Sequence, residues 1–321
     1  MLFILNLTII GENPKTTKPE ELSIPSEWKN LSGHNKPVLT LNFSPNGELL
    51  ASGSEDDIVK IWSIEKGDEL ASLFSHKGDI AQVSFSPVSS SLLASASWDG
   101  TIKIWDQSLE TKKWKEINTF SVNEKPIYTI AFSPDGKFIA AGGEDSKIYL
   151  WSLATGKVVK IFTEHTKAVH CVVFSPDGLS LASCGTDNTI KLWSVADGKQ
   201  KFTLTGHLKT VSKVIFSKDG NYLVSSGYDN TIKVWSLKEA KEVTTLNAHS
   251  WFVLGICFSS DGKILASTSA DKSIKLWNIQ NHKKIFSLSG HTDWVFTVTF
   301  HPEKNLFATA GNDKIIKIWK Y

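Results

Sequence analysis

Seven tryptophans recur along this chain at almost constant spacing. They are Trp62, Trp105, Trp151, Trp193, Trp235, Trp277 and Trp319, at intervals of 43, 46, 42, 42, 42 and 42 residues. An aspartate stands six residues before each one, at Asp56, Asp99, Asp145, Asp187, Asp229, Asp271 and Asp313. A fixed period of about 42 residues indicates a repeat architecture, and this length is typical of one four-stranded blade of a β-propeller.

A histidine nine residues before a phenylalanine forms a second landmark. It occurs at His34, His76, His165, His207, His249 and His291, whereas the third repeat has Asn123 at this position. Apolar residues follow four, seven and nine residues later, as in Val211, Val214 and Phe216. Because the side chains of a regular strand alternate with a period of two, the step of three predicts a β-bulge early in the first strand of every repeat.

The end of the chain predicts how the ring of repeats closes. Only two residues follow Trp319, so the seventh repeat has no fourth strand of its own. Upstream of the first repeat, residues 28–34 match a fourth strand, with Leu31 at the expected place. The sequence therefore predicts an all-β fold over residues 26–321: a seven-bladed β-propeller of four-stranded antiparallel blades, in which the N-terminal strand completes the last blade and leaves no exposed edge. Residues 1–25 are predicted to be an N-terminal tail or linker, beginning with an apolar stretch, 1–10, that is too short to span a bilayer.

These motifs resemble the WD-repeat (WD-40) family. The residues that carry the resemblance are Gly-His, Val-x-x-Val-x-Phe-Ser-Pro-Asp-Gly, Leu-Ala-Ser and Asp-x-Thr-Ile-Lys-x-Trp, in seven phased copies over residues 26–321. The family implies a buried relay in each blade, from the turn aspartate through the histidine and a strand serine or threonine to the tryptophan. The hydroxyl residues at that position are Ser52, Ser95, Ser183, Ser225, Ser267 and Thr309. The third repeat departs from the pattern with Asn123, Ala141 and Tyr149, so its blade is expected to lack the relay.

Composition limits the partners and the compartment. The formal net charge is only +2, and all 35 basic residues are lysine. Because arginine is the usual bidentate reader of guanine and phosphate, sequence-specific nucleic-acid binding is not expected, nor is a membrane partner. Cys171, Cys184 and Cys257 show no metal-ligand spacing, and an odd count without a disulfide framework fits a reducing compartment. We therefore expect a cytoplasmic protein, a monomer or part of a larger complex, with no cofactor and no metal.

The six sets of Asp, His and Ser or Thr invite a hydrolase interpretation. A catalytic triad is not needed six times in one chain, and these hydroxyl residues fall in strands, so a structural role is favoured. His165 and His170 are five residues apart, but His165 belongs to the relay, which argues against a metal site. The sequence predicts a protein that is not an enzyme.

The candidate binding residues are those that differ between blades. Three positions in each repeat should surround the channel mouth on the face that carries the histidine loops and aspartate turns, which we call the top face. Large aromatic residues gather at these positions although the fold does not require them, and exposed aromatic clusters concentrate interface energy. The predicted partner-binding residues are Trp98, Tyr128, His170, Tyr228, Trp251, Phe252, Trp294 and Phe296.

The sequence thus predicts a non-catalytic scaffold or adaptor that binds a protein or peptide partner on its top face. One alternative is a sensing or recognition module of a larger multidomain signalling protein, and a distant alternative is an enzyme that uses the central channel. Blade two also carries extra residues around 107–115, which we expect on the opposite, bottom face as a solvated loop containing Trp114.

Overall fold

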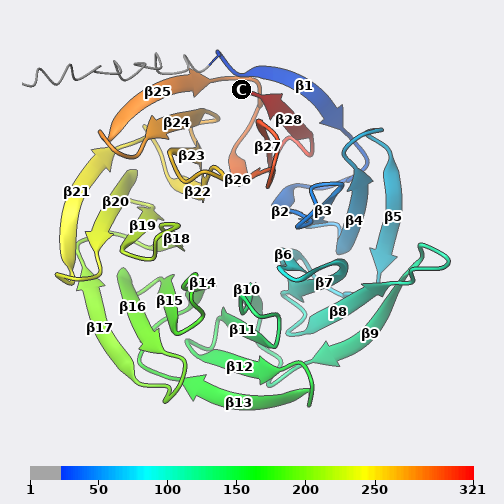
Figure 1. The fold of residues 1–321 in the computed structure, drawn as a ribbon, viewed down its shortest axis with the longest axis horizontal. Coiled ribbons are helices and arrows are strands. Elements are labelled where there is room, and N and C mark those ends of the chain that lie inside the picture. Colours follow the sequence, from blue (N-terminus) through cyan, green and yellow to red (C-terminus); the bar gives the residue numbers. More distant parts are fainter. Residues whose placement is uncertain (1–22) are drawn as a thin grey trace, which may run out of the picture.

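The computed structural model describes residues 23–321, which form seven four-stranded antiparallel sheets arranged as a ring (Figure 1). Each sheet is one blade, and its four strands run from the axis of the ring to the outside. The prediction of an all-β seven-bladed propeller is confirmed. The prediction that residues 1–25 form a tail or linker falls largely outside the described residues and stays a prediction.

The strands fall into four concentric sets. The innermost strands are β2 (Val38–Phe43), β6 (Ile80–Ser86), β10 (Ile127–Phe132), β14 (Val169–Phe174), β18 (Val211–Phe216), β22 (Val253–Phe258) and β26 (Val295–Phe300). The second strands are β3 (Leu49–Ser54), β7 (Ser89–Ser97), β11 (Phe138–Gly143), β15 (Ser180–Gly185), β19 (Tyr222–Gly227), β23 (Ile264–Ser269) and β27 (Leu306–Gly311).

The outer half of each blade holds the repeated tryptophan and the link to the next blade. The third strands are β4 (Ile58–Ser63), β8 (Ile102–Gln107), β12 (Ile148–Ser152), β16 (Thr189–Ser194), β20 (Thr231–Ser236), β24 (Ile274–Asn278) and β28 (Ile316–Lys320). The outermost strands are β5 (Glu69–Phe74), β9 (Trp114–Phe120), β13 (Lys157–Phe162), β17 (Gln200–Thr205), β21 (Lys241–Asn247), β25 (Lys283–Leu288) and β1 (Ser26–Leu31).

The predicted bulge is present in every innermost strand. In blade five the register shifts between Val211 and Lys213, and the other six blades shift at the same place. The bulge brings the apolar residues four and seven after the landmark onto one side of the strand, so Val211 and Val214 are both buried.

The hydrophobic cores lie between neighbouring blades, where each repeated tryptophan packs against the blade before it. One core joins Val224 and Val234 of blade five to Ile256 and Trp277 of blade six. Because each blade buries its two faces against its neighbours, no blade has a complete core until the ring is closed. Within the part of the chain that the structure describes, no helix has the length and hydrophobicity that a membrane crossing requires.

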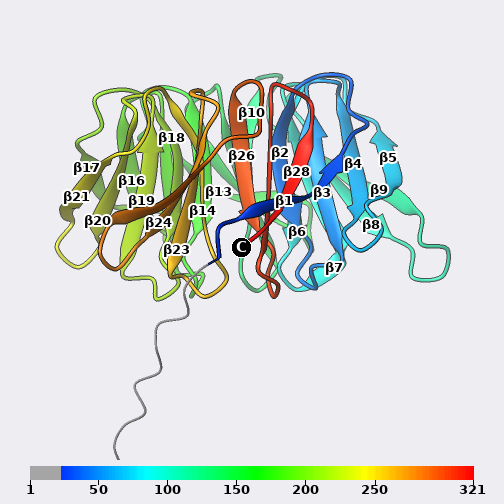
Figure 2. The same cartoon turned by 90° about the horizontal axis from the view of Figure 1, so that it is seen from above.

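The N-terminal strand closes the ring, as predicted. β1 pairs antiparallel with β28 and becomes the outermost strand of blade seven, which Figure 2 shows from the side. Leu31 is buried in the core between blades seven and one, and the Lys317 ammonium lies 2.6 Å from the Glu27 carboxylate. On the inner side, His301 of blade seven lies 3.1 Å from the Gly47 carbonyl of blade one. Strand pairing, apolar burial and polar contacts therefore all contribute to closure.

Candidate functional site

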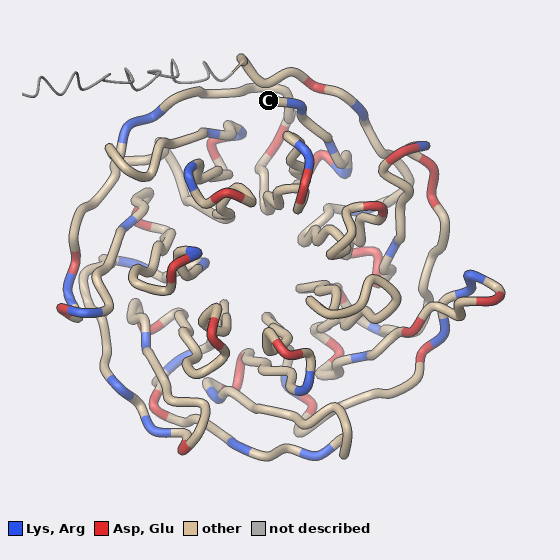
Figure 3. Tube along the Cα trace, viewed as in Figure 1, with Lys and Arg blue, Asp and Glu red and all other residues tan. Residues whose placement is uncertain are grey.

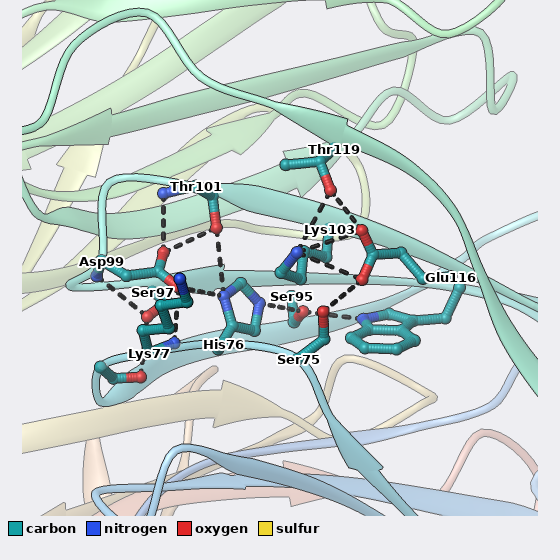
Figure 4. A network of polar contacts seen from close by, with 12 residues as sticks. Ser75, His76, Lys77, Ser95, Ser97, Asp99, Thr101, Lys103, Glu116 and Thr119 are labelled. Carbon is teal, nitrogen blue, oxygen red and sulfur yellow. Dashed lines mark hydrogen bonds and ion pairs between the residues drawn. The ribbon is translucent and has the colours of Figure 1, made fainter.

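The polar relay that the family resemblance implied is present in six blades. In blade two, His76 Nδ1 lies 2.9 Å from the Asp99 carboxylate, and His76 Nε2 lies 2.7 Å from the Ser95 hydroxyl (Figure 4). The indole N–H of Trp105 donates to the same hydroxyl at 2.8 Å. The relay thus connects the turn between β7 and β8 to the buried tryptophan.

The donors and acceptors of the relay fit one protonation state. An indole nitrogen can only donate, so the serine oxygen accepts from the tryptophan, and its own hydrogen points to the histidine Nε2. The histidine is then neutral and donates from Nδ1 to the aspartate. In blade six, burial lowers the pKa of His249 and outweighs the opposing effect of Asp271, in agreement with a neutral ring.

The same distances recur around the ring. The His–Asp contacts span 2.7–2.9 Å, the contacts from His to Ser or Thr span 2.7–2.8 Å, and the Trp contacts span 2.8–2.9 Å. All six hydroxyl residues have 0% exposure. A substrate has no access to these hydroxyls, so the six sets have a structural role in their blades and are not catalytic triads.

Blade three replaces the relay with a shorter network. The Asn123 side-chain amide donates to the Asp145 carboxylate at 2.6 Å, and the Tyr149 hydroxyl donates to the same oxygen at 2.7 Å. Burial, followed by the hydrogen bond to Asp145, raises the pKa of Tyr149 to about 12, so the hydroxyl keeps its proton. A cavity of about 10 Å³ lies among Asn123, Ala141, Tyr149 and Trp151. The absence of a His–Ser relay is confirmed. The sequence did not predict that Asn123 and Tyr149 would instead donate hydrogen bonds to the turn aspartate.

A second polar pair ties the third strand to the outermost strand. In blade two the Lys103 ammonium contacts Glu116 at 3.1 Å and Thr119 at 3.3 Å, beside the relay in Figure 4. Equivalent ion pairs join Lys60 to Glu69, Lys233 to Glu242 and Lys317 to Glu27. Blade three has Tyr149 at the lysine position, and there the side chain points to the turn aspartate instead.

The predicted binding residues form two aromatic clusters on the top face. The first cluster, Trp98, Tyr128 and His170, crosses blades two, three and four. The Trp98 and Tyr128 rings lie 6.0 Å apart edge to face, and Tyr128 stacks on His170 at 5.4 Å. His170 Nε2 also lies 2.8 Å from the Thr186 hydroxyl, and burial lowers the pKa of His170, which favours the neutral ring. The first cluster is therefore a continuous series of ring contacts across three blades.

The second cluster consists of Tyr228, Trp251, Phe252, Trp294 and Phe296, from blades five, six and seven. Tyr228 stacks on Phe252 at 4.6 Å, and Trp251 bridges to Trp294 at 6.2 Å. Trp294 in turn contacts Phe296 at 6.3 Å. All eight predicted residues therefore belong to one cluster or the other.

Three tryptophans remain open to solvent within these clusters. Trp98 is 48% exposed, Trp251 is 50% exposed and Trp294 is 37% exposed. The other five residues are half-buried beneath or beside them. Rings that pack on one another are held in fixed orientations, so the exposed indoles present a pre-organised apolar surface.

Two carboxylates that the sequence analysis did not select lie near the first cluster. Burial raises the pKa of Glu55, and the neighbouring charge of Asp79 raises it further. Burial and then the charge of Asp57 raise the pKa of Asp79, whose carbonyl accepts the backbone N–H of Trp98 at 3.0 Å. Glu55 and Asp79 occupy two of the top-face positions whose residue type varies between blades. This variation is the sequence signal that could have marked them as candidate site residues. Elsewhere acidic and basic residues are interspersed around the ring (Figure 3).

The extra residues of blade two lie on the bottom face, as predicted, but Trp114 is not part of a solvated loop. β9 begins at Trp114, whose ring packs on Phe85 at 6.1 Å and on the core between blades one and two. Trp114, Leu49 and Ala71 all pack against this apolar core, and burial of the indole removes its surface from water. Residues 108–113 form the projecting loop between β8 and β9.

Among residues 23–321 no group of three or more histidine, cysteine or acidic side chains is arranged to hold a metal ion. Cys171, Cys184 and Cys257 are free cysteines. Cys171 and Cys184 lie opposite each other on β14 and β15, and Cys257 lies on β22. All three cysteines are therefore in strands.

The fold and the relays define a propeller of the WD-repeat class, and comparison with known families agrees. The family described as "WD domain, G-beta repeat" matches residues 26–63, 67–106, 114–152, 156–194, 198–236, 240–278 and 282–320. This protein belongs to that family. Each matched segment contains the outermost strand of one blade and the three inner strands of the next, so the repeats are offset from the blades by one strand.

Curated relatives match about half of this chain or less. A "Periodic tryptophan protein 2 homolog" of Dictyostelium discoideum is 36% identical over 144 residues, which is 42% of this chain and 15% of the relative. The "COMPASS component SWD3" of Saccharomyces cerevisiae is 31% identical over 40% of this chain and 42% of its own length. The "Nuclear distribution protein nudF 1" of Talaromyces marneffei is 29% identical over 47% of this chain and 31% of its own length.

Proposed function

We propose that this propeller is a non-catalytic scaffold or adaptor that binds a protein or peptide partner on its top face. The observation that carries the proposal is the pair of aromatic clusters, in which Trp98, Trp251 and Trp294 are exposed. Each cluster also contains one stacked pair of rings, Tyr128 with His170 and Tyr228 with Phe252. Binding energy at protein interfaces concentrates in such aromatic anchors. The relatives support a role in assemblies, because one of them is named "COMPASS component SWD3".

The second cluster is the stronger of the two candidate anchors. It carries two exposed indoles, Trp251 and Trp294, whereas the first cluster carries one. The Lys209 ammonium lies over the Phe252 ring, 5.9 Å from its centroid, and places a positive charge beside the second cluster. A partner that buries an apolar side chain against Trp251 and Trp294 would desolvate both rings at once.

The test compares exposed tryptophans at different places on the molecule. Affinity capture with the full chain identifies the partner, and each variant is then titrated against it. Trp294→Ala and Trp251→Ala should each cost about 2–4 kcal/mol of binding, or roughly 30- to 1,000-fold in affinity. Trp28→Ala is the matched control, because Trp28 is 43% exposed but lies on β1 at the outside of the ring. Trp114→Ala is unsuitable as a control, because its packing in the core predicts a loss of stability.

If Trp294→Ala and Trp251→Ala bind like the unaltered protein while Trp28→Ala loses the partner, the binding surface is the outer rim and the proposal is wrong. The same top face would serve a recognition module of a larger signalling protein, and a longer transcript would distinguish that alternative. The cytoplasmic location expected from the three cysteines stays a prediction.

A further inference from the structure

An apolar pocket opens on the bottom face between blades five and six. Its volume is about 420 Å³, within the range typical of ligand sites. Its lining includes six apolar or aromatic side chains, Tyr222, Val224, Val234, Val243, Phe258 and Ile279, together with the polar Gln280 and His282. Its rim includes the hairpins at Ser217–Asp219 and Asp261–Gly262, which follow the innermost strands and therefore lie opposite the relay face.

Beside the pocket residues Val234 and Val243, blade five has a small residue where blades four and six have a large one. Thr244 on β21 pairs with Val234 on β20, so both side chains face blade six. At the same register position blade four has Phe202, opposite Leu192, and blade six has Phe286, opposite Leu276. Phe202 and Phe286 pack into the cores next to them.

Two other interfaces carry different residues at this place. Between blades one and two the corresponding residue is Ala71, and Trp114 of blade two packs against the same core. Between blades seven and one it is Lys29, whose ammonium donates to the Ile64 carbonyl at 3.0 Å. Between blades five and six Val243, which is 47% exposed, and the half-buried Phe258 remain beside an open space.

The described chain begins on the same face as this pocket. Ser26 pairs with Lys320 at the end of β28, and β28 leaves its aspartate turn on the top face, so β1 starts on the bottom face. Figure 1 shows that start at the outside of the ring between β25 and β1, beside blade six. Residues 11–22 connect this point to an apolar stretch, Met1 to Ile10, which contains eight apolar residues out of ten.

We propose that residues 1–10 of this chain dock into the pocket between blades five and six. An extended linker spans up to about 3.3 Å per residue, so residues 11–22 reach roughly 40 Å, enough to pass one blade. The apolar walls and the apolar segment match in chemistry, and docking removes both from water. Tethering raises the effective concentration of the segment at the pocket, which favours it over a free ligand.

Disulfide trapping in the full chain tests the proposal. The double variant Phe3→Cys with Val243→Cys should form an intramolecular disulfide under a mild oxidant. The matched control pairs Phe3→Cys with Leu70→Cys, because Leu70 is 51% exposed and occupies the position of Val243 on β5 of blade one. Blade six and blade one lie on opposite sides of the start of β1 in Figure 1. We expect trapping at Val243 to be at least ~10-fold faster.

Filling the pocket provides an independent readout. Thr244→Phe introduces the residue that blades four and six carry at this place, and it should reduce trapping at Val243 to the rate of the Leu70 control. Deleting residues 1–10 should lower the melting temperature of the unaltered chain but not that of the Thr244→Phe variant. Equal trapping at Val243 and Leu70 would overturn the proposal, as would a disulfide between two chains, which would make the occupant a second copy. Unchanged trapping in a folded Thr244→Phe variant would also refute it.

Discussion

His249→Ala tests the structural role of the relay. The substitution removes the contact between Nδ1 and the Asp271 carboxylate at 2.9 Å and that between Nε2 and the Ser267 hydroxyl at 2.8 Å. Both partners stay where they are: Ser267 has 0% exposure and still accepts the indole N–H of Trp277 at 2.9 Å. The substitution therefore leaves a buried hydroxyl without its acceptor and a carboxylate without one of its donors.

The magnitude follows from what each partner retains. Asp271 keeps the backbone N–H groups of Ser250 and Ser273, each at 3.0 Å, so its charge remains partly compensated. Ser267 has only a carbonyl at 3.5 Å to receive its hydrogen, which is too long for a good bond. A buried polar group left unsatisfied costs about 1–3 kcal/mol, and we expect a loss of stability in this range.

Asn123→Ala in blade three is the comparison. It removes one donor to Asp145, but the Tyr149 hydroxyl still donates to the same carboxylate at 2.7 Å, and Ala141 has no hydroxyl to leave unsatisfied. The expected loss is about 0.5–1.5 kcal/mol, the net value of a single hydrogen bond. Urea denaturation measures both variants, and the difference should appear in the midpoint at an unchanged slope. Equal midpoints for the two variants would refute the reasoning.

Two further predictions concern closure and acid stability. Deleting residues 1–33 removes β1 and the buried Leu31, so the exposed edge of blade seven should cause aggregation, whereas deleting residues 1–20 should leave a soluble ring; size-exclusion chromatography distinguishes the two. Burial opposes ionisation of the six relay aspartates, but hydrogen bonds from histidine and backbone outweigh it and hold each pKa below the ordinary value of 3.8. Burial lowers the pKa of His249 from 6.5. Depressed pKa values add stability that is lost as pH falls, so the melting temperature should decline below about pH 6.5 and more steeply below pH 3.8, and a flat profile from pH 7 to 3 would contradict this.

The sequence by itself determined the blades, their bulges and the closure. These features depend on local, periodic signals: a strand alternates with a period of two, a bulge shifts that alternation by one residue, and turn residues mark each hairpin. Because the same pattern occurs seven times, the sequence assigns both Trp62 and Trp319 to the third strand of their blades. The missing strand after Trp319 was equally visible, because the repeat shows what ought to follow it.

The tertiary structure decided what happens between blades. From the sequence, Trp98 and Trp114 were both expected to be exposed, but Trp98 is exposed while Trp114 packs against the core between blades one and two. The pocket between blades five and six likewise depends on side chains from both blades. Periodicity describes each unit separately, whereas packing depends on the volumes that meet across an interface, and those volumes are known only when the ring is closed.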